Sequence, residues 1–256
     1  MDKSYWSKFY AKHIADKKPS LFAKFVWENY LREMPHFCHI ERSEVSQKNS
    51  LRLIELGCGN GRDSVYFAKN GVTVLGIDQC ENMIDSLNKK HKSANLAFKS
   101  GDFTALPNAE SAFDTIYSRF TLHSINASQQ SNLFKWISAN LKADGILAIE
   151  CRGYKNALYG LGEMVETDAF IYENHYRRFV NLESLLEILG DDYQIAFAKE
   201  DKGFAPFKDE DDFFVRIIAI YRGGGELSLN IFLLFTITLD SRYSQNLHDK
   251  RTPYVA

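Results

Sequence analysis

The chain has 256 residues, a formal net charge of −2 and 45% hydrophobic residues. This length suits one α/β domain with insertions, and the small net charge provides no basic field that would attract a nucleic-acid backbone. The first residues, MDKSYWSKFY, are charged and aromatic, unlike a signal peptide, and no apolar run reaches the length of a membrane span. The four cysteines show no paired spacing, which favours a reducing, cytoplasmic setting: Cys38, Cys58, Cys80 and Cys151.

Residues 1–50 are expected to form a helical cap and a linker that precede the main domain. The aromatic side chains of Trp6 and Tyr10 either close over a ligand site or anchor an amino-terminal helix on the core. Residues 20–33 carry apolar side chains at helical spacing, whereas residues 36–50 are polar and aperiodic. His36, Cys38 and His39 lack a fourth ligand and the spacing of a metal site, so we expect no bound metal.

Residues 51–64, LRLIELGCGNGRDS, combine a short apolar run, three alternating glycines and the start of a helical pattern. Strand, glycine turn and helix open a doubly wound nucleotide-binding fold. The glycines allow a sharp turn and close approach of a ligand, and the helix start offers N–H groups to an anion. A dinucleotide fingerprint requires Gly or Ala at the sixth position from Gly57, where this chain has Arg62. An oxidoreductase that uses a nicotinamide cofactor is therefore disfavoured.

The rest of the chain alternates between strand and helix patterns, which predicts a doubly wound, Rossmann-like α/β sheet with helices on both faces. Expected strands cover 72–77, 95–99, 113–118, 146–151, 193–198 and 213–221, and expected helices cover 81–92, 128–141 and 182–189. Asp78 follows Gly57 by 21 residues (78 − 57), close to the spacing of an acid that holds ribose hydroxyls, although it could also cap the next helix. In such a sheet the ends of the first and fourth strands flank the ligand crevice.

Glu55 followed by Gly57-Cys58-Gly59-Asn60-Gly61 resembles the first motif of the class I S-adenosylmethionine (SAM) dependent methyltransferases. The resemblance covers residues 5–221 and includes the LKxxG-like turn at 142–145. It implies a seven-stranded sheet whose last strand is antiparallel. The runs SRFTLHSI, ECR, HYRRF and EDDFFVRIIA resemble a subgroup of bacterial methyltransferases that accompany surface-polysaccharide or nucleotide-sugar pathways.

The same resemblance implies SAM as the cofactor and proposes which residues contact it. Residues 101–103 resemble the family's adenine-binding turn, with a plain Gly-Asp turn as the alternative. The expected cofactor contacts are Glu55, Gly57, Cys58, Gly59, Gly61, Arg62, Asp63, Asp78, Gln79, Met83, Asp102, Phe103, Ser118, Trp6 and Tyr10.

Candidates for the chemistry lie after the fourth strand and in an insertion, residues 152–180, which we expect to form a lid over the acceptor. His123, His175 and Arg119 are the catalytic candidates, and Glu150 is a further candidate base. Arginine suits an anionic acceptor because its planar fork binds carboxylate or phosphate at two points. The expected acceptor-binding residues are Arg152, Tyr176, Arg177 and Arg178. Neighbours in an extended segment face opposite ways, so one of the last two arginines should point inward.

These observations divide the chain into a cap at 1–50, a methyltransferase domain at 51–222 and a tail at 223–256 with no assigned role. The predicted function is methyl transfer from SAM to a small anionic acceptor, and the subgroup resemblance implies a hydroxyl of a sugar or nucleotide sugar. A SAM-binding module without turnover and a methyltransferase acting on protein or RNA remain alternatives. We expect no nucleic-acid or membrane partner, and a homodimer remains open.

Overall fold

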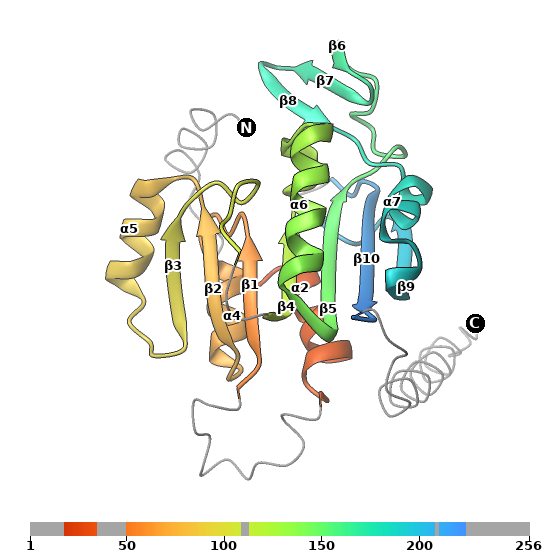
Figure 1. Ribbon diagram of the computed structural model, residues 1–256. Coiled ribbons are helices and arrows are strands. Elements are labelled where there is room, and N and C mark those ends of the chain that lie inside the picture. Colours follow the sequence, from red (N-terminus) through yellow and green to blue (C-terminus); the bar gives the residue numbers. More distant parts are fainter. Residues whose placement is uncertain (1–17, 35–49, 109–112, 208–209, 224–256) are drawn as a thin grey trace, which may run out of the picture.

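A computed structural model describes residues 18–34, 50–108, 113–207 and 210–223. Its centre is a seven-stranded sheet in the order β3-β2-β1-β4-β5-β10-β9 (Figure 1). The inner strands pair in parallel, whereas β10 is antiparallel to both of its neighbours, β5 and β9. The predicted doubly wound sheet with an antiparallel last strand is confirmed.

The elements follow the expected alternation. The strands of the large sheet are β1 (Arg52–Leu56), β2 (Thr73–Asp78), β3 (Leu96–Ser100), β4 (Phe113–Arg119), β5 (Leu141–Arg152), β9 (Tyr193–Asp201) and β10 (Phe214–Tyr221). The α-helices are α2 (Leu21–Val26), α4 (Arg62–Lys69), α5 (Glu81–Lys90), α6 (Ala127–Asn140) and α7 (Leu182–Leu189). Short helical turns are η1 (Trp27–Leu31), η3 (Leu122–Ser124) and η4 (Gly190–Asp192).

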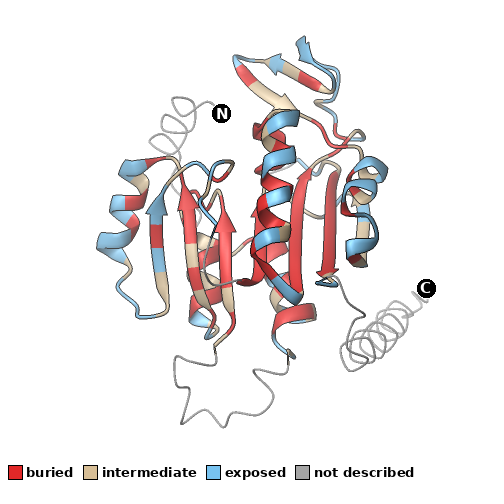
Figure 2. Ribbon diagram, viewed as in Figure 1, coloured by how far each residue is buried: buried red, intermediate tan, exposed pale blue. Residues whose placement is uncertain are grey.

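Helices cover both faces of the sheet, and each face has its own apolar cluster. One cluster joins α6 and α7 to the sheet through residues such as Leu133, Ile137 and Leu185. The other joins α2 and α4 to the opposite face through Phe22, Phe67 and Tyr117. The central strands are therefore buried almost throughout (Figure 2), as a continuous apolar run predicts for a parallel sheet.

Two elements differ from the sequence-based expectation. The helix expected over 20–33 is α-helical only at Leu21–Val26 and continues as the π-helix η1, Trp27–Leu31. The turn expected at 142–145 lies inside β5, where the pairing with β4 shifts register and Asp144 has φ of 60°. A bulge of this kind accommodates the extra residues without ending the strand.

The insertion after β5 folds as a second, three-stranded antiparallel sheet of β6 (Glu163–Glu166), β7 (Ala169–Tyr172) and β8 (His175–Arg178). Its two ends meet where Gly153 bridges Val180, so the insertion leaves and re-enters the fold at one point. The small sheet lies beyond the carboxyl ends of β4 and β5, next to the start of α6 (Figure 1), and β8 packs against η3. It therefore stands at the edge where an open α/β sheet binds its ligands.

Candidate active site

The loop between β1 and α4 depends on the backbone freedom of its glycines. Gly57, Gly59 and Gly61 all have positive φ, between 52° and 70°. A Cβ at Gly57 would lie 2.5 Å from Thr121 Cγ2, so the loop after β1 packs directly on the loop after β4. A side chain at Gly57 would therefore separate the two halves of the crevice.

Asp78 stands at the end of β2 and holds this loop by its carboxylate. Its Oδ2 accepts a hydrogen bond from the Gly59 amide at 2.9 Å, and its Oδ1 accepts one from the Cys80 amide at 2.9 Å. Each carboxylate oxygen can accept a further bond. The expected placement of an acid beside the glycine loop agrees with this geometry, and the same carboxylate also begins the turn into α5.

The start of α4 is less open to a ligand than the sequence suggests. The Ser64 hydroxyl and the Ser64 amide both hydrogen bond to the buried Glu55 carboxyl, and Asn60 Oδ1 accepts from the Arg62 amide at 3.3 Å. Burial, together with the nearby Asp63 charge, raises the pKa of Glu55 well above its usual range. Glu55 therefore occupies a position at the helix amino terminus that we expected an anionic ligand to take.

The turn after β3 approaches the glycine loop from the side. Asp102 Oδ1 accepts hydrogen bonds from the Thr104 amide at 2.8 Å and the Thr104 hydroxyl at 2.7 Å, while the side chain is exposed. The buried Phe103 ring would lie 3.7 Å from a Cβ at Gly57. The carboxylates after β2 and β3 match the hydroxyl and amine donors of a nucleoside, and the Phe103 ring lies beside the glycine loop. These residues fit an adenosyl group.

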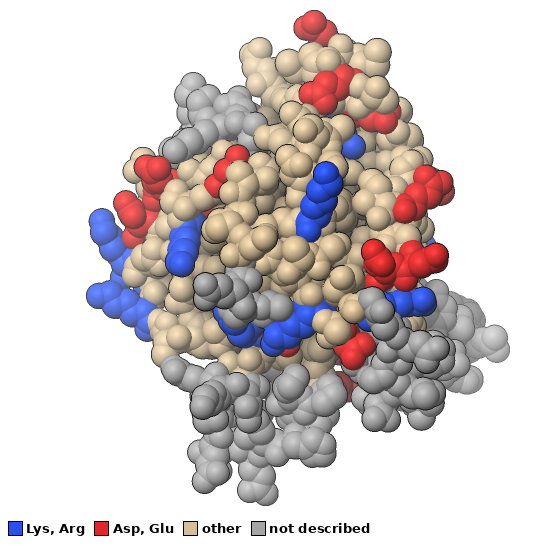
Figure 3. All heavy atoms as spheres, in the orientation of Figure 1, with Lys and Arg blue, Asp and Glu red and all other residues tan. Residues whose placement is uncertain are grey.

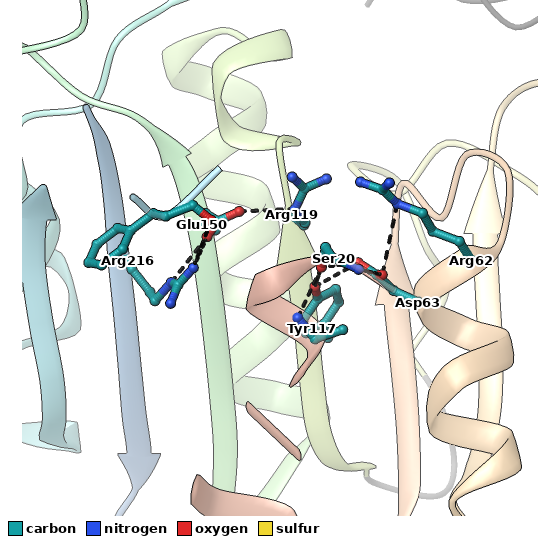
Figure 4. A network of polar contacts seen from close by, with 9 residues as sticks. Ser20, Arg62, Asp63, Tyr117, Arg119, Glu150 and Arg216 are labelled. Atoms are coloured by element: carbon teal, nitrogen blue, oxygen red, sulfur yellow. Dashed lines mark hydrogen bonds and ion pairs between the residues drawn. The ribbon is translucent and has the colours of Figure 1, made fainter. Parts of the chain in front are cut away.

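Asp63, expected at the cofactor, binds α2 instead. Its carboxylate accepts from the Ser20 amide at 2.7 Å, the Ser20 hydroxyl at 2.7 Å and the Tyr117 hydroxyl at 2.9 Å (Figure 4). Ser20 in turn caps α2 by accepting from the Ala23 amide at 2.9 Å. Asp63 is 2% exposed, so these contacts replace its hydration and fix the amino terminus of α2 beside the glycine loop.

Three charged residues lie side by side on β4, β5 and β10. The fully buried Glu150 accepts from Arg119 Nε at 2.9 Å and from Arg216 Nη2 at 2.6 Å. Arg216 is also surrounded by the rings of Phe22, Phe25 and Phe204 at 4.1–5.0 Å. Glu150 therefore faces two guanidinium groups rather than the crevice, which argues against its expected role as a base.

Arg119 bonds Glu150 through its Nε, and its guanidinium lies 3.9 Å from the centre of the Phe120 ring. Figure 4 shows the guanidinium groups of Arg119 and Arg62 pointing toward each other from β4 and α4, above Ser20 and Asp63.

The loop after β4 is held by a hydrogen bond within it. Ser118, expected at the cofactor, is buried, and its hydroxyl hydrogen bonds to Thr121. The backbone at this point is strained, since Phe120 has φ of 60°, and its ring stacks on Phe214. Such strain costs about 1–3 kcal/mol and is concentrated at functional sites.

His123 in η3 is 4% exposed, and its Nδ1 has no hydrogen-bond partner in the described part of the chain. Burial lowers the pKa of His123 well below its usual range. Positive charges lower this pKa further; they belong to Arg152, His175, Arg177 and Arg119. The fold therefore collects catalytic and acceptor-binding candidates from β4, β5 and β8 around one buried imidazole.

Neighbouring residues of β8 take different roles, as alternation along a strand predicts. Arg177 lies within electrostatic reach of His123 and donates to the Tyr172 carbonyl at 3.0 Å. Arg178 donates to Gln130 Oε1 on α6 at 2.6 Å. Arg177 is therefore the residue of the pair whose charge acts on His123, while Arg178 attaches the small sheet to α6.

The other expected residues are more loosely connected to this site. Arg152 donates to Asn156 Oδ1 at 3.0 Å, and its guanidinium lies 5.1 Å from the Phe214 ring centre. The Tyr176 hydroxyl is buried without a partner among the described residues, and burial beside Glu166 raises its pKa to about 12.

Among the remaining cofactor candidates, Met83 and Cys58 join a small apolar cluster under the glycine loop, and Gln79 is half-buried. Trp6, Tyr10 and the 36–39 segment lie outside the described residues.

The sequence reading missed Ser20, Tyr117 and Gln130 as partners of charged residues, and it read Arg216 only as part of a strand. The contacts Ser20–Asp63 and Gln130–Arg178 join residues 43 and 48 positions apart, and no short motif encodes them. The sequence did contain one indication that Arg216 is paired, because a charged residue within an apolar strand requires a buried partner. That partner is Glu150, directly opposite on β5.

In the described ranges, no three His, Cys, Asp or Glu side chains come together as a metal site. Those ranges also contain no helix that is long and apolar enough to cross a bilayer. On the face in Figure 3, basic and acidic side chains are interspersed.

Residues 53–145 match the model of a methyltransferase domain family. An uncharacterized methyltransferase of Synechocystis sp. is 28% identical over 98 residues, which cover 38% of this chain and 45% of the relative. A malonyl-[acyl-carrier protein] O-methyltransferase of Bacillus cereus is 31% identical over 136 residues, 50% of this chain and 48% of the relative. The matched region thus spans about half the length of these relatives.

Among solved structures, a SAM-dependent methyltransferase from Methanosarcina mazei aligns with a TM-score of 0.58 at 19% identity, over 70% of this chain and 94% of that one. This likeness concerns the fold, and the family match covers the strands and loops that carry the glycine turn, Asp78 and Asp102. Residues 53–145 therefore match a methyltransferase domain family, and the described chain has the Rossmann-like fold of solved SAM-dependent methyltransferases.

Proposed function

We propose that the protein transfers the methyl group of SAM to a small anionic acceptor held beneath the β6–β8 sheet. The observation that carries the proposal is the buried His123 imidazole, with its unpartnered Nδ1 and the positive charges that surround it. A buried polar atom without a partner is rare in a protein and suggests a ligand. Positive groups around it favour a negatively charged one.

Residues in one half of the crevice would bind the cofactor, and residues in the other half would bind the acceptor. SAM, when bound, supplies a methyl group on a positively charged sulfur. Asp78 would accept from the ribose hydroxyls, and Asp102 from the adenine amine. Phe120 and Phe214 would exclude water, while Arg152 and Arg177 would orient the acceptor. Positioning and dehydration of this kind lower the barrier when the leaving group is already activated.

The chemical class of the acceptor is a further part of this proposal. The sequence resemblance implies a hydroxyl of a sugar or nucleotide sugar, with the arginines holding a diphosphate or a uronate. The name of the Bacillus cereus relative describes transfer to an oxygen, which supports oxygen as the methylated atom. Both the hydroxyl and the anionic group of such an acceptor contain candidate oxygens.

Calorimetry and label transfer test the proposal together. We expect SAM to bind at micromolar concentration and NAD not to bind, and we expect methyl-labelled SAM to lose its label to acceptors in a panel of nucleotide sugars and sugar acids. SAM binding without transfer to this panel, to a small-molecule extract or to protein and RNA would favour a non-catalytic module. Transfer to protein or RNA alone would replace the small acceptor.

A further inference from the structure

The buried carboxyl groups of the described chain all accept hydrogen bonds from the chain's own donors. Glu150 faces two arginines, Asp63 holds Ser20 and Tyr117, and Glu55 holds Ser64. Asp78 holds the amides of Gly59 and Cys80, and Asp114, at the other edge of the sheet, holds the Arg52 amide and Lys142. None of these groups therefore has the placement of a base that takes a proton from an acceptor.

The imidazole of His123 is also a poor base in this setting. It is buried, and β8, which carries His175 and Arg177, packs against its helical turn η3. The centres of the His123 and Phe120 rings lie 5.5 Å apart, and the guanidinium of Arg119 lies 3.9 Å from the centre of the same Phe120 ring. The charges of Arg119 on β4, Arg152 on β5, and His175 and Arg177 on β8 all lower the pKa of His123. Gaining a proton would place another positive charge among these cations. A hydroxyl acceptor usually needs such a base within hydrogen-bond reach, whereas an acceptor that is already an anion does not.

We propose that the nucleophile is a carboxylate oxygen of the acceptor, so that the reaction forms a methyl ester. This inference rests on the proposed function and chooses between the two kinds of oxygen that it leaves open. An electron pair of the carboxylate oxygen forms the new O–CH3 bond, and the electrons of the S–CH3 bond go to sulfur. One negative and one positive charge disappear together, and no proton has to move.

The arrangement of the lid fits this chemistry. Arg177 lies on β8, which packs against the turn η3 that carries His123. Arg152 lies 5.1 Å from the centre of the Phe214 ring, which stacks on the Phe120 ring beside His123. Arginine forks match carboxylate geometry. An unprotonated His123 keeps one ring N–H that can donate to the second carboxylate oxygen. His123 would thus orient the acceptor through a hydrogen bond.

The chemical stability of the transferred label tests the inference. The full chain is incubated with methyl-labelled SAM and a panel of matched acids and alcohols, namely glucuronate and glucose, UDP-glucuronate and UDP-glucose, and octanoate and octanol. A small-molecule extract of the encoding organism serves as a further acceptor source. We expect label that mild base releases as volatile methanol, because esters are hydrolysed and ethers are not.

The outcomes separate the inference from the proposed function. Label that remains bound after base treatment overturns the carboxylate assignment and leaves small-molecule methyl transfer standing. SAM binding with no label in any acceptor overturns both. Label released by base from the acids but absent from the matched alcohols supports both.

A second test uses His123→Gln, which keeps a hydrogen-bond donor but cannot act as a base in this pH range. If His123 orients a carboxylate, kcat falls less than tenfold, and kcat/KM of the wild type stays level between pH 6.5 and 8.5. His123→Ala should lower kcat much more than His123→Gln, with SAM affinity nearly unchanged. A loss of a hundredfold or more in His123→Gln, with a wild-type rate that rises with pH, would identify a general base and overturn the inference.

Discussion

At the scale of single residues, the crevice depends on which side chains remain available to a ligand. Asp78 and Asp63 are both buried acids close to the glycine turn, 15 residues apart in sequence (78 − 63). Each carboxylate oxygen of Asp78 accepts one hydrogen bond from a backbone amide and can accept another, whereas Asp63 already accepts three hydrogen bonds from Ser20 and Tyr117. The two acids should therefore respond differently to substitution.

Asp78→Ala should raise the dissociation constant for SAM about tenfold or more, because it removes a charge-assisted bond worth about 1.5–3 kcal/mol. Isothermal calorimetry measures the change, and Asp85→Ala on the exposed face of α5 is the matched control. An unchanged dissociation constant would mean that the ribose is held by other residues.

Arg177→Gln should raise the KM of the acceptor about tenfold or more, because this arginine reaches the His123 cluster. Arg178→Gln removes the bond to Gln130 and should mainly lower the stability of the small sheet, by about 1 kcal/mol. Acceptor kinetics and thermal unfolding of both variants separate the two effects. A larger KM change in Arg178→Gln would reverse the assignment of the inward residue.

At the scale of elements, α2 is fixed at its amino terminus by polar contacts and along its length by apolar packing. Ser20 joins Asp63, while Phe22 stacks on Tyr117 with ring centres 4.9 Å apart. The three-residue ladder of Arg119, Glu150 and Arg216 adds a second connection, because Phe22 and Phe25 also surround Arg216. The position of α2 is therefore coupled to the strands that end at the crevice.

Asp63→Ala should lower the free energy of unfolding by about 3 kcal/mol, since three buried donors lose a charged acceptor. Tyr117→Phe should cost about 1 kcal/mol, since one hydroxyl is lost while Asp63 keeps both bonds to Ser20. Urea unfolding of the two single variants and the double variant measures the coupling between them. If the loss of stability in the double variant equals the sum of the two single losses, the contacts act independently and the network is not coupled.

At the scale of the whole molecule, buried ionisable groups make stability depend on pH. The folded-state pKa of His123 lies below its value in the unfolded chain, so the unfolded chain binds a proton first as the pH falls. The contribution of His123 is present above its unfolded pKa of about 6.5 and is lost as the pH falls from there toward the folded pKa. The pKa of Glu55 is raised in the folded chain, so its contribution to stability is present at low pH and is lost as the pH rises.

Between pH 6.5 and 5.5 the wild type should therefore lose stability relative to His123→Gln, with a limiting slope of about 1.4 kcal/mol per pH unit. Urea unfolding of both proteins at pH 7.5, 6.5 and 5.5 measures this difference, and the comparison cancels the contribution of Glu55. A difference that does not change with pH would mean that His123 titrates equally in both states.

The sequence by itself determined the local patterns: the buried strands, the glycine turn after β1, and an acid at the end of β2. These follow from side-chain periodicity and from the conformations that glycine allows, which depend on neighbouring residues only. The seven strands and the antiparallel last strand were expected from the family resemblance, and the structure supplies the order in which the strands pair.

Only the tertiary structure decided which charged residues serve the fold and which face the crevice. Asp63 and Glu150 read as site residues in sequence, but packing brings them Ser20 and Arg216, which lie 43 and 66 positions away. Likewise, Arg177 and Arg178 are equivalent in sequence until α6 presents Gln130 to one of them. The physical reason is that a buried charge must find a partner, and that partner is set by contacts between distant elements.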